Sequence, residues 1–185
     1  MSSSEHAHSR DYQGFTLWFT GLSGAGKTTL AAAVGRELAA RGRRVEILDG
    51  DEVRRAVNRG LGFSKPERDS HVRYVGFVAR LLSRNGIVAI SAMISPYREV
   101  RDEIRHAHDV RFVEVFVDCP LEQLVLRDTK GLYARALRGE IPNFTGVSDP
   151  YEPPDSPDIH VRTDVESIGE SCDKIIQWLS VHGLV

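Results

Sequence analysis

The eight residues Gly21 to Thr28 have the types and spacing of a phosphate-binding loop, Gly-Leu-Ser-Gly-Ala-Gly-Lys-Thr. Glycines let the backbone turn so tightly that its N–H groups face one spot, and a following helix adds its positive end. In such a loop Lys27 contacts the β- and γ-phosphates of a nucleoside triphosphate, and the Thr28 hydroxyl binds Mg²⁺. The alternative is a glycine-rich turn that binds nothing, and the apolar run before the loop and helix-prone stretch after it disfavour that. Nucleotide contacts are predicted from Gly21, Leu22, Ser23, Gly24, Ala25, Gly26, Lys27, Thr28 and Thr29.

An acidic motif, Asp49-Gly50-Asp51, follows another β-rich run. Because glycine turns the chain sharply, both carboxylates can point toward the γ-phosphate. One could order the Mg²⁺ shell through water, and the other could accept a proton from an acceptor hydroxyl; alternatively, Asp51 only caps the helix that begins there. Arg54, one turn further along, could reach an anionic acceptor. The third predicted strand ends in Ser95-Pro96 without an acid, which favours a small-molecule kinase over an ATPase motor.

Two loops carry an aromatic residue and an arginine that could hold an acceptor. Phe63 and Phe144 could clamp a flat ring, and Arg68 could hold an acidic group. The alternative is that each Phe only anchors its own loop. No Asn-Lys-x-Asp tetrad occurs, which disfavours a GTP switch, and the histidines show no zinc-ligand spacing.

Short β-rich runs alternate with helical patterns, which predicts an α/β fold with a central parallel sheet covered on both faces. The predicted strands are Phe15–Thr20, Val45–Asp49, Ile87–Ala92, Phe112–Val117 and Ile159–Arg162. Helices are predicted over Lys27–Ala40, from near Asp51, from Pro66 to Asn85-Gly86, from Pro96, over Leu132–Arg138 and over Ser167–Leu179.

The stretch from about 128 to 158 breaks the alternation, because it is rich in Gly, Pro, Asn and charged residues. Loops this long in compact domains are usually functional or disordered. With Lys130, Arg135 and Arg138 it is interpreted as a lid over the nucleotide, the alternative being a solvated loop.

Length and composition indicate one domain. The chain has 185 residues, of which 41% are hydrophobic, and its 24 Lys and Arg nearly balance 26 Asp and Glu, which argues against nucleic acid or a membrane as partner. Residues 1–14 are expected to form a flexible tail and 15–185 a single domain. Cys119 and Cys172 suggest a reducing compartment. Without a targeting segment or a membrane span, we expect a cytoplasmic protein.

Six motifs in order resemble the adenylylsulfate kinase family over nearly the whole chain after Gly14. They are Gly21–Thr28, Asp49-Gly50-Asp51 with Arg54, Leu61-Gly62-Phe63-Ser64 with Arg68, Ile94-Ser95-Pro96, Lys130-Gly131-Leu132-Tyr133 and Asn143-Phe144-Thr145-Gly146. The resemblance implies a P-loop NTPase fold with three α/β/α layers and a lid. It also implies phosphorylation of the 3′-hydroxyl of adenosine 5′-phosphosulfate by ATP with Mg²⁺, in sulfate assimilation. Family members are commonly homodimers, so the resemblance implies a homodimer, and it also allows association with ATP sulfurylase.

Carried over by position, the resemblance implies roles for individual residues. Phe63 and Phe144 would sandwich the substrate adenine, while Arg54 and Arg68 would bind its phosphosulfate side. Lys130 would neutralise charge on the transferring phosphoryl group, Asp49 and Asp51 would manage metal and acceptor hydroxyl, and Arg127 would lie on the ATP side. Ser95 matches a serine described in the family as a phosphorylated intermediate. We favour direct in-line transfer, with Ser95 and the Ile94 backbone placing the substrate, because the sequence gives Ser95 no base.

Three positions depart from the family pattern: His71 stands where Asn is usual, Tyr74 where Arg is usual, and Ala134 where Lys is frequent. Since His and Asn differ in donor and acceptor geometry, His71 could alter substrate affinity and make it pH-dependent. Two other hypotheses for the function of the chain stay open. One is a weakly active or regulatory nucleotide-binding partner of a sulfurylase, and the other is a kinase of a related nucleoside.

Overall fold

The computed structural model describes residues 13–57, 60–128 and 130–185. Its centre is a five-stranded sheet in the order β2-β3-β1-β4-β5, in which every neighbouring pair is parallel. The strands are β1 (Thr16–Thr20), β2 (Val45–Asp49), β3 (Val88–Ala92), β4 (Phe112–Asp118) and β5 (Ile159–Arg162). The predicted fold class is confirmed, and the predicted tail lies almost wholly outside the described residues.

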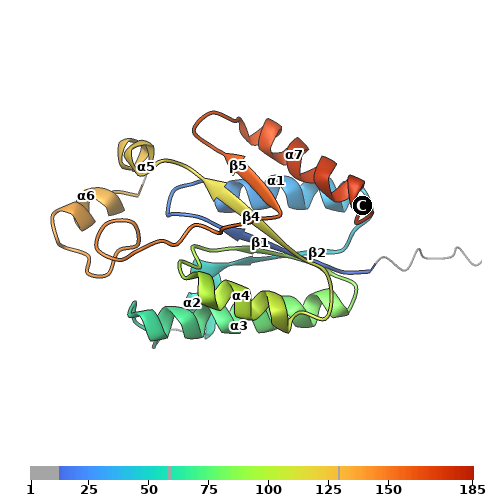
Figure 1. Ribbon diagram of the computed structural model, residues 1–185, viewed down its shortest axis with the longest axis horizontal. Coiled ribbons are helices and arrows are strands. Elements are labelled where there is room, and N and C mark those ends of the chain that lie inside the picture. The colour runs from blue at the N-terminus through green and yellow to red at the C-terminus, as the bar shows by residue number, and fades with distance from the viewer. Residues whose placement is uncertain (1–12, 58–59, 129) are drawn as a thin grey trace, which may run out of the picture.

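Helices cover both faces of the sheet, so its central strands are buried throughout (Figure 1). One face carries α1 (Lys27–Ala40) and α7 (Ile168–Val181), and the other carries α3 (Lys65–Arg84) and α4 (Arg98–Ala107). Each face has its own apolar core, the larger one under α1 and α7 and the smaller one around Trp18. Strands with two buried faces are expected to be almost continuously apolar, as β1 and β3 are.

The remaining helices gather near the carboxyl ends of the strands: α2 (Gly50–Val57), α5 (Leu121–Arg127) and α6 (Leu132–Leu137) (Figure 1). Several helical boundaries differ from the prediction by one or two residues; α7, for example, ends at Val181 rather than Leu179. The helix predicted from Pro96 begins at Arg98, and α5 was not predicted, because seven residues are too few for a clear periodicity. No helix in the described part of the chain is both long and apolar enough to cross a bilayer.

Two sequence signals set the limits of α3. Ser64 and Glu67 form a capping box with Pro66 in the first turn, and the helix ends at Asn85-Gly86, where Gly86 has a φ of 77°. This twenty-residue helix holds Arg68 and His71 on its buried side. A local capping signal thereby fixes which side chains face the carboxyl ends of the strands.

Candidate active site

The phosphate loop, Gly21–Thr28, joins β1 to α1 and requires glycine where the prediction placed it. Gly24 and Gly26 have φ values of 77° and 93°, a region that residues with a Cβ rarely adopt. A Cβ on Gly21 would lie 2.2 Å from the Val117 carbonyl oxygen of β4. The loop therefore presses its backbone against the sheet while the amino end of α1 opens toward the cavity beside it.

Lys27 lies at the start of α1 and is only 8% exposed. Its ammonium group donates to the carbonyl oxygens of Gly21 at 2.9 Å and Leu22 at 2.7 Å. Burial lowers the pKa of Lys27 to about 8, and the opposing attraction of Asp51 and Asp49 is weaker. Burial disfavours the protonated, charged form of Lys27, and a bound polyphosphate would stabilise that form again. The loop is therefore suited to an anionic ligand.

Asp49, the last residue of β2, uses its two carboxylate oxygens differently. Oδ1 accepts from the backbone N–H groups of Asp51 at 3.0 Å and Glu52 at 3.2 Å, which caps α2. Oδ2 accepts from the Thr28 hydroxyl at 2.8 Å. This hydroxyl and carboxylate are oxygen donors of the kind that Mg²⁺ prefers, and they fit an ion that takes its other ligands from phosphate and water. The described residues contain no cluster of three or more His, Cys, Asp or Glu that could hold a metal.

The alternative role of Asp51 as a helix cap is wrong, since α2 begins at Gly50 and Asp49 supplies the cap. The Asp51 side chain is 73% exposed and lies 3.7 Å from the Lys130 ammonium group, which is 67% exposed. Ion pairs this exposed stabilise a fold very little. Both groups are instead available to a ligand in the cavity that they line.

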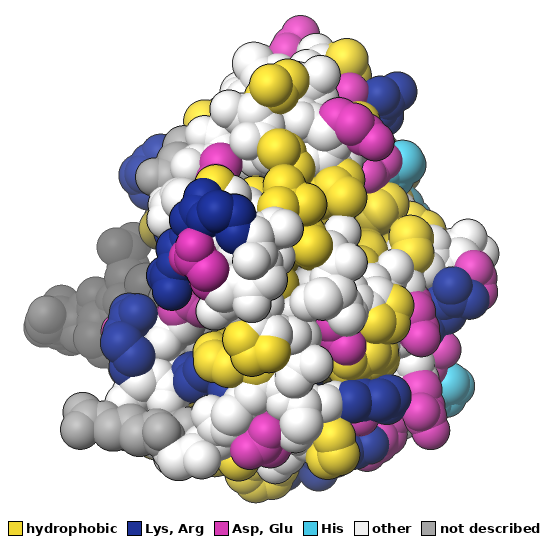
Figure 2. Space-filling model, turned by 90° about the vertical axis from the view of Figure 1, so that its left-hand side faces the viewer, with side chains coloured by type: hydrophobic (Ala, Val, Ile, Leu, Met, Phe, Trp, Pro, Cys, Tyr) yellow, Lys and Arg dark blue, Asp and Glu magenta, His cyan; other side chains and the backbone are white. Residues whose placement is uncertain are grey.

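A cavity of about 410 Å³ extends from the phosphate loop to α3; we call it the main cavity. It contains most of the predicted site residues: Ser23, Gly24, Gly26, Lys27, Thr28, Thr29, Asp49, Asp51, Arg54, Phe63, Arg68, His71, Ile94, Ser95 and Lys130. Figure 2 shows the molecule from the side of α5 and α6, where hydrophobic side chains and Lys, Arg, Asp and Glu side chains are interspersed.

The wall opposite the phosphate loop combines an aromatic ring with cations. Phe63 is 57% exposed, and the Arg54 guanidinium lies 4.7 Å from its ring centre. Arg54 also donates to the carbonyl oxygens of Leu61 at 3.2 Å and Gly62 at 2.7 Å. These contacts hold a positive charge over one face of the Phe63 ring, so a flat ring and a cation meet at this wall, an arrangement able to bind an anionic nucleotide.

Arg68 and His71 are held by the backbone. Arg68, 8% exposed, donates to the carbonyl oxygens of Phe63 and Asn143 and to the Thr145 hydroxyl, and so ties α3 to the lid segment, residues 128–158. His71, 4% exposed, contacts the Gly50 carbonyl oxygen at 3.1 Å through Nε2. Burial and then the neighbouring Arg54 lower the pKa of His71, which keeps it neutral at pH 7.

Five predicted residues do not line the main cavity. Gly21 is one of them, because its backbone is pressed against Val117 of β4. Phe144 packs edge-on against Tyr133, with ring centres 5.1 Å apart, so a sandwich of Phe63 and Phe144 is not formed in this structure. Leu22 faces a different cavity, and Ala25 and Arg127 line a third one. A short sequence pattern cannot determine how a loop packs on distant residues, and Phe144 belongs to such a loop.

Ser95, at the carboxyl end of β3, is 2% exposed and has a φ of 39°. Its hydroxyl accepts from the Trp18 indole N–H at 3.1 Å, and indole is a donor only. The neighbouring Ile94 carbonyl accepts from the Thr20 hydroxyl at 2.8 Å. The contact with Trp18 does not give the Ser95 hydroxyl a base, so the geometry favours a positioning role over a nucleophilic one.

Arg127 lines a hollow that it shares with residues not predicted from the sequence. A hollow of about 290 Å³ next to the phosphate loop is lined by Arg127 and by Thr163, Ser167 and Ile168 at the start of α7. Arg127 donates to the Thr163 carbonyl at 2.6 Å, and the Thr163 hydroxyl contacts the Ala25 carbonyl at 3.0 Å. The position of Thr163 directly after the last strand was the signal that could have indicated it.

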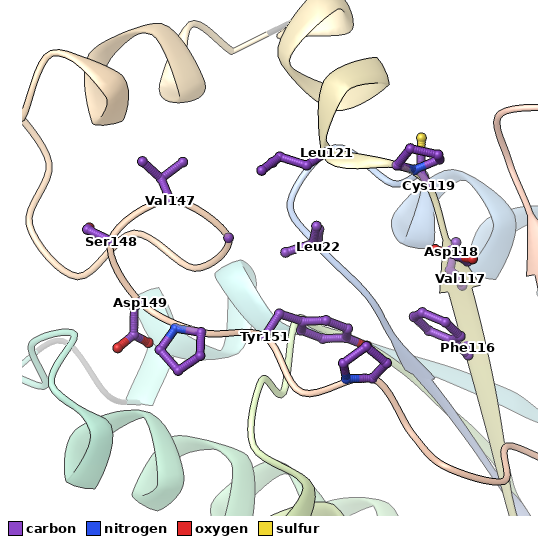
Figure 3. A pocket seen from close by; sticks show the side chains of 14 residues that line it. Leu22, Phe116, Val117, Asp118, Cys119, Leu121, Val147, Ser148, Asp149 and Tyr151 are labelled. Carbon is purple, nitrogen blue, oxygen red and sulfur yellow. The ribbon is translucent and has the colours of Figure 1, made fainter.

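A further cavity of about 600 Å³ lies on the other side of the phosphate loop (Figure 3). Leu22, Leu121 and Val147 form its apolar walls, and the Tyr151 ring stacks on Phe116, with centres 6.1 Å apart. Asp118 and Asp149 are its only carboxylates among the described residues. None of the predicted catalytic residues lines it.

The fold and main cavity define a P-loop kinase of small molecules: a phosphate loop, a carboxylate able to share Mg²⁺, and an acceptor side with an aromatic ring and two arginines. The sequence profile of the adenylylsulphate kinase family matches residues 13–162. The chain belongs to this family and is a kinase that uses ATP.

Individual relatives support the same family assignment. A probable adenylyl-sulfate kinase of Pseudomonas aeruginosa is 55% identical over 94% of this chain and 80% of its own length. A probable bifunctional SAT/APS kinase of Sorangium cellulosum is 55% identical over 93% of this chain but 29% of its own length. The solved structure of the Mycobacterium tuberculosis APS kinase CysC with AMPPNP and APS superimposes with a TM-score of 0.86 at 40% identity, covering 91% and 98% of the two chains.

Proposed function

We propose that this chain transfers the γ-phosphoryl group of ATP to the 3′-hydroxyl of adenylyl sulfate, giving ADP and 3′-phosphoadenylyl sulfate. The observation that carries the proposal is one cavity in which a phosphate loop faces Phe63, Arg54 and Arg68. The loop binds a polyphosphate, and the opposite wall binds a purine next to an anion. Two nucleotides bound in this way would lie end to end, as phosphoryl transfer between them requires.

The transfer needs charge neutralisation and alignment more than covalent chemistry. Lys27 and Lys130 would hold the charge of the phosphoryl group from two sides. The γ-phosphorus forms a bond to the 3′-oxygen as its bond to the β–γ bridging oxygen breaks, and Asp51 would take the hydroxyl proton. Thr28 and Asp49 would hold Mg²⁺, which neutralises the phosphate oxygens when bound.

The acceptor residues would act mainly by binding. Phe63 would stack on the adenine, and Phe144 would supply a second ring once the lid segment closes. Arg54 and Arg68 would bind the phosphosulfate side, His71 would contact the acceptor nucleoside, and Ser95 with the Ile94 carbonyl would place the ribose. Arg127 would lie beside the ATP adenine.

We further propose that the protein works as a homodimer in the cytoplasm. The existence of a bifunctional SAT/APS kinase relative also makes association with a sulfurylase reasonable. Light scattering after size exclusion would measure the mass of the particle, and a mass of one chain, 20.6 kDa, would contradict the dimer.

ADP release from ATP separates the possible acceptors. The purified full-length chain with Mg²⁺ is given adenylyl sulfate, AMP, adenosine or no acceptor. We expect turnover only with adenylyl sulfate. Turnover with another acceptor alone would contradict the substrate assignment, and no acceptor-dependent turnover would favour a regulatory nucleotide-binding protein.

A further inference from the structure

One buried cation outside the main cavity connects two parts of the acceptor side. Arg101 lies on α4 and is 1% exposed, beneath the carboxyl end of the sheet. Its Nε donates to the Glu114 carboxylate of β4 at 2.9 Å. One of its terminal nitrogens donates to the Ser95 carbonyl at 2.7 Å, and the other donates to the Glu152 carbonyl at 2.7 Å.

The first partner, Ser95, needs outside support for its backbone. A φ of 39° is uncommon for a residue with a Cβ, and such a conformation persists only where the surroundings hold it. Arg101 holds the Ser95 carbonyl, while Trp18 holds its hydroxyl. The Ser95 carbonyl also accepts from the Thr20 hydroxyl, at 3.4 Å. The turn that presents Ile94 and Ser95 to the main cavity is therefore supported by side chains that lie behind it, of which Arg101 makes the shortest contact to the carbonyl.

The second partner, Glu152, lies where the lid segment returns to the sheet. Its N–H donates to the Pro96 carbonyl at 2.9 Å, and its carboxylate accepts from the Arg98 N–H at 2.7 Å. The preceding Tyr151 lies over the sheet in Figure 3, and its hydroxyl contacts Thr20 at 3.0 Å. Thr20 in turn donates to the Ile94 carbonyl, so the base of the lid segment and the Ser95 turn form one network.

The planar guanidinium suits this position better than an ammonium group would. Three separate nitrogens reach a carboxylate and two carbonyls in fixed directions, which a single lysine nitrogen on a flexible stem cannot reproduce. Glu114 supplies the compensating charge, without which a buried cation would be costly.

We propose that Arg101, anchored by Glu114, is a positioning residue that sets the Ser95 turn and the base of the lid segment relative to each other for binding of the acceptor nucleotide. This rests on the proposed function, because it assumes that Ile94, Ser95 and the lid segment bind adenylyl sulfate. Arg101 lies outside the main cavity and acts only through these neighbours.

The same cluster provides a matched control. Arg105, one turn further along α4, contacts Glu114 at 3.3 Å and Asp158 at 3.0 Å, but neither Ser95 nor Glu152. Each Arg→Lys change removes one guanidinium group that contacts Glu114. Only Arg101→Lys also removes the contacts to Ser95 and Glu152, whereas Arg105, whose side chain is 31% exposed, contacts the lid segment only at its last residue, Asp158.

The test compares the two KM values of each full-length variant. For Arg101→Lys we expect the KM for adenylyl sulfate to rise about tenfold and the KM for ATP to change less than about twofold, because two hydrogen bonds to acceptor-side carbonyls are lost. Arg105→Lys should leave both KM values within about twofold. Equal rises in both KM values, or a lower melting temperature alone, would overturn the proposal.

A spectroscopic readout reports on the Ser95 turn directly. The chain has two tryptophans, and Trp178→Phe leaves Trp18, whose indole N–H contacts Ser95, as the sole emitter. In that background Arg101→Lys should shift the emission maximum and Arg105→Lys should not.

If Arg101→Lys does not fold, Glu114→Gln replaces it. We then expect the KM for adenylyl sulfate to rise about threefold, and an unchanged KM together with an unchanged emission maximum would overturn the proposal. Failure of wild type to use adenylyl sulfate would instead refute the proposed function.

Discussion

The two halves of the main cavity are built in different ways. The donor half is built mainly from one contiguous segment, Gly21–Thr28, whose backbone conformation follows from its glycines and the helix after it, and Asp49 of β2 adds one carboxylate. The acceptor half draws on α2, α3, the end of β3 and the lid segment, which are brought together only by the fold. In the donor half, a substitution should therefore lower activity by removing a functional group. In the acceptor half, a substitution that only disturbs the packing between segments should lower activity as well.

The largest effect is expected from Lys27→Ala in the donor half. Loss of the ammonium group should lower kcat about 10³-fold, because its charge acts where water is excluded. The melting temperature should not fall, since Lys27 is a buried cation with a lowered pKa. ADP release and thermal unfolding measure the two quantities, and a loss below tenfold would contradict the assigned role.

A smaller loss, about 10²-fold in kcat, is expected for Asp51→Asn at the boundary between the halves. The fold should be unaffected, because Asp51 is exposed and Asp49 caps α2. Glu52→Gln, the next residue on α2, is the control and should keep normal turnover. Near-normal turnover of Asp51→Asn would leave Asp51 without a catalytic role.

In the acceptor half, Phe63→Leu should raise the KM for adenylyl sulfate about tenfold while the KM for ATP stays constant. Phe77→Leu provides a closely matched control, because Phe77 on α3 is 56% exposed against 57% for Phe63 and does not line the main cavity. Equal KM values for the two variants would show that Phe63 does not stack on the substrate.

The pH dependence of the donor half follows from Lys27, whose pKa in the free protein is about 8. As pH rises through this value the ammonium group loses its proton, so kcat/KM for ATP should fall, by about tenfold between pH 7 and pH 9. Lys27→Arg should be less active but should show a flatter profile, since guanidinium stays charged. A wild-type profile that stays level to pH 9 would contradict the assignment.

The smallest effect is expected from His71→Asn in the acceptor half. The pKa of His71 is lowered below its ordinary 6.5, so the unfolded chain binds its proton more readily than the folded one. The free energy of unfolding should therefore decrease as pH falls below 6.5, and the variant should lack this part of the decrease. Melting temperatures at pH 7.5 and pH 5.5 test this, and parallel shifts in both proteins would argue against it.

Local sequence signals were enough for the donor half and the sheet. All five strands appear within one residue of their predicted limits, and α1 has its predicted limits, Lys27–Ala40. Such features depend on periodicity, glycine and capping residues that lie close together in the chain. α5 was not predicted, because its seven residues are too few to show a helical periodicity.

The acceptor half shows what the sequence left open. Its residue types indicated a ring and anion site, but they could not indicate that Asp49 rather than Asp51 caps α2, or that Phe144 packs on Tyr133. They gave no sign of Arg101 behind Ser95 either. The conformation of the phosphate loop is determined by the sequence itself, because its glycines and the helix that follows it are adjacent in the chain. The rest was decided by the tertiary structure, because contacts between residues dozens of positions apart exist only once the sheet has brought their segments together.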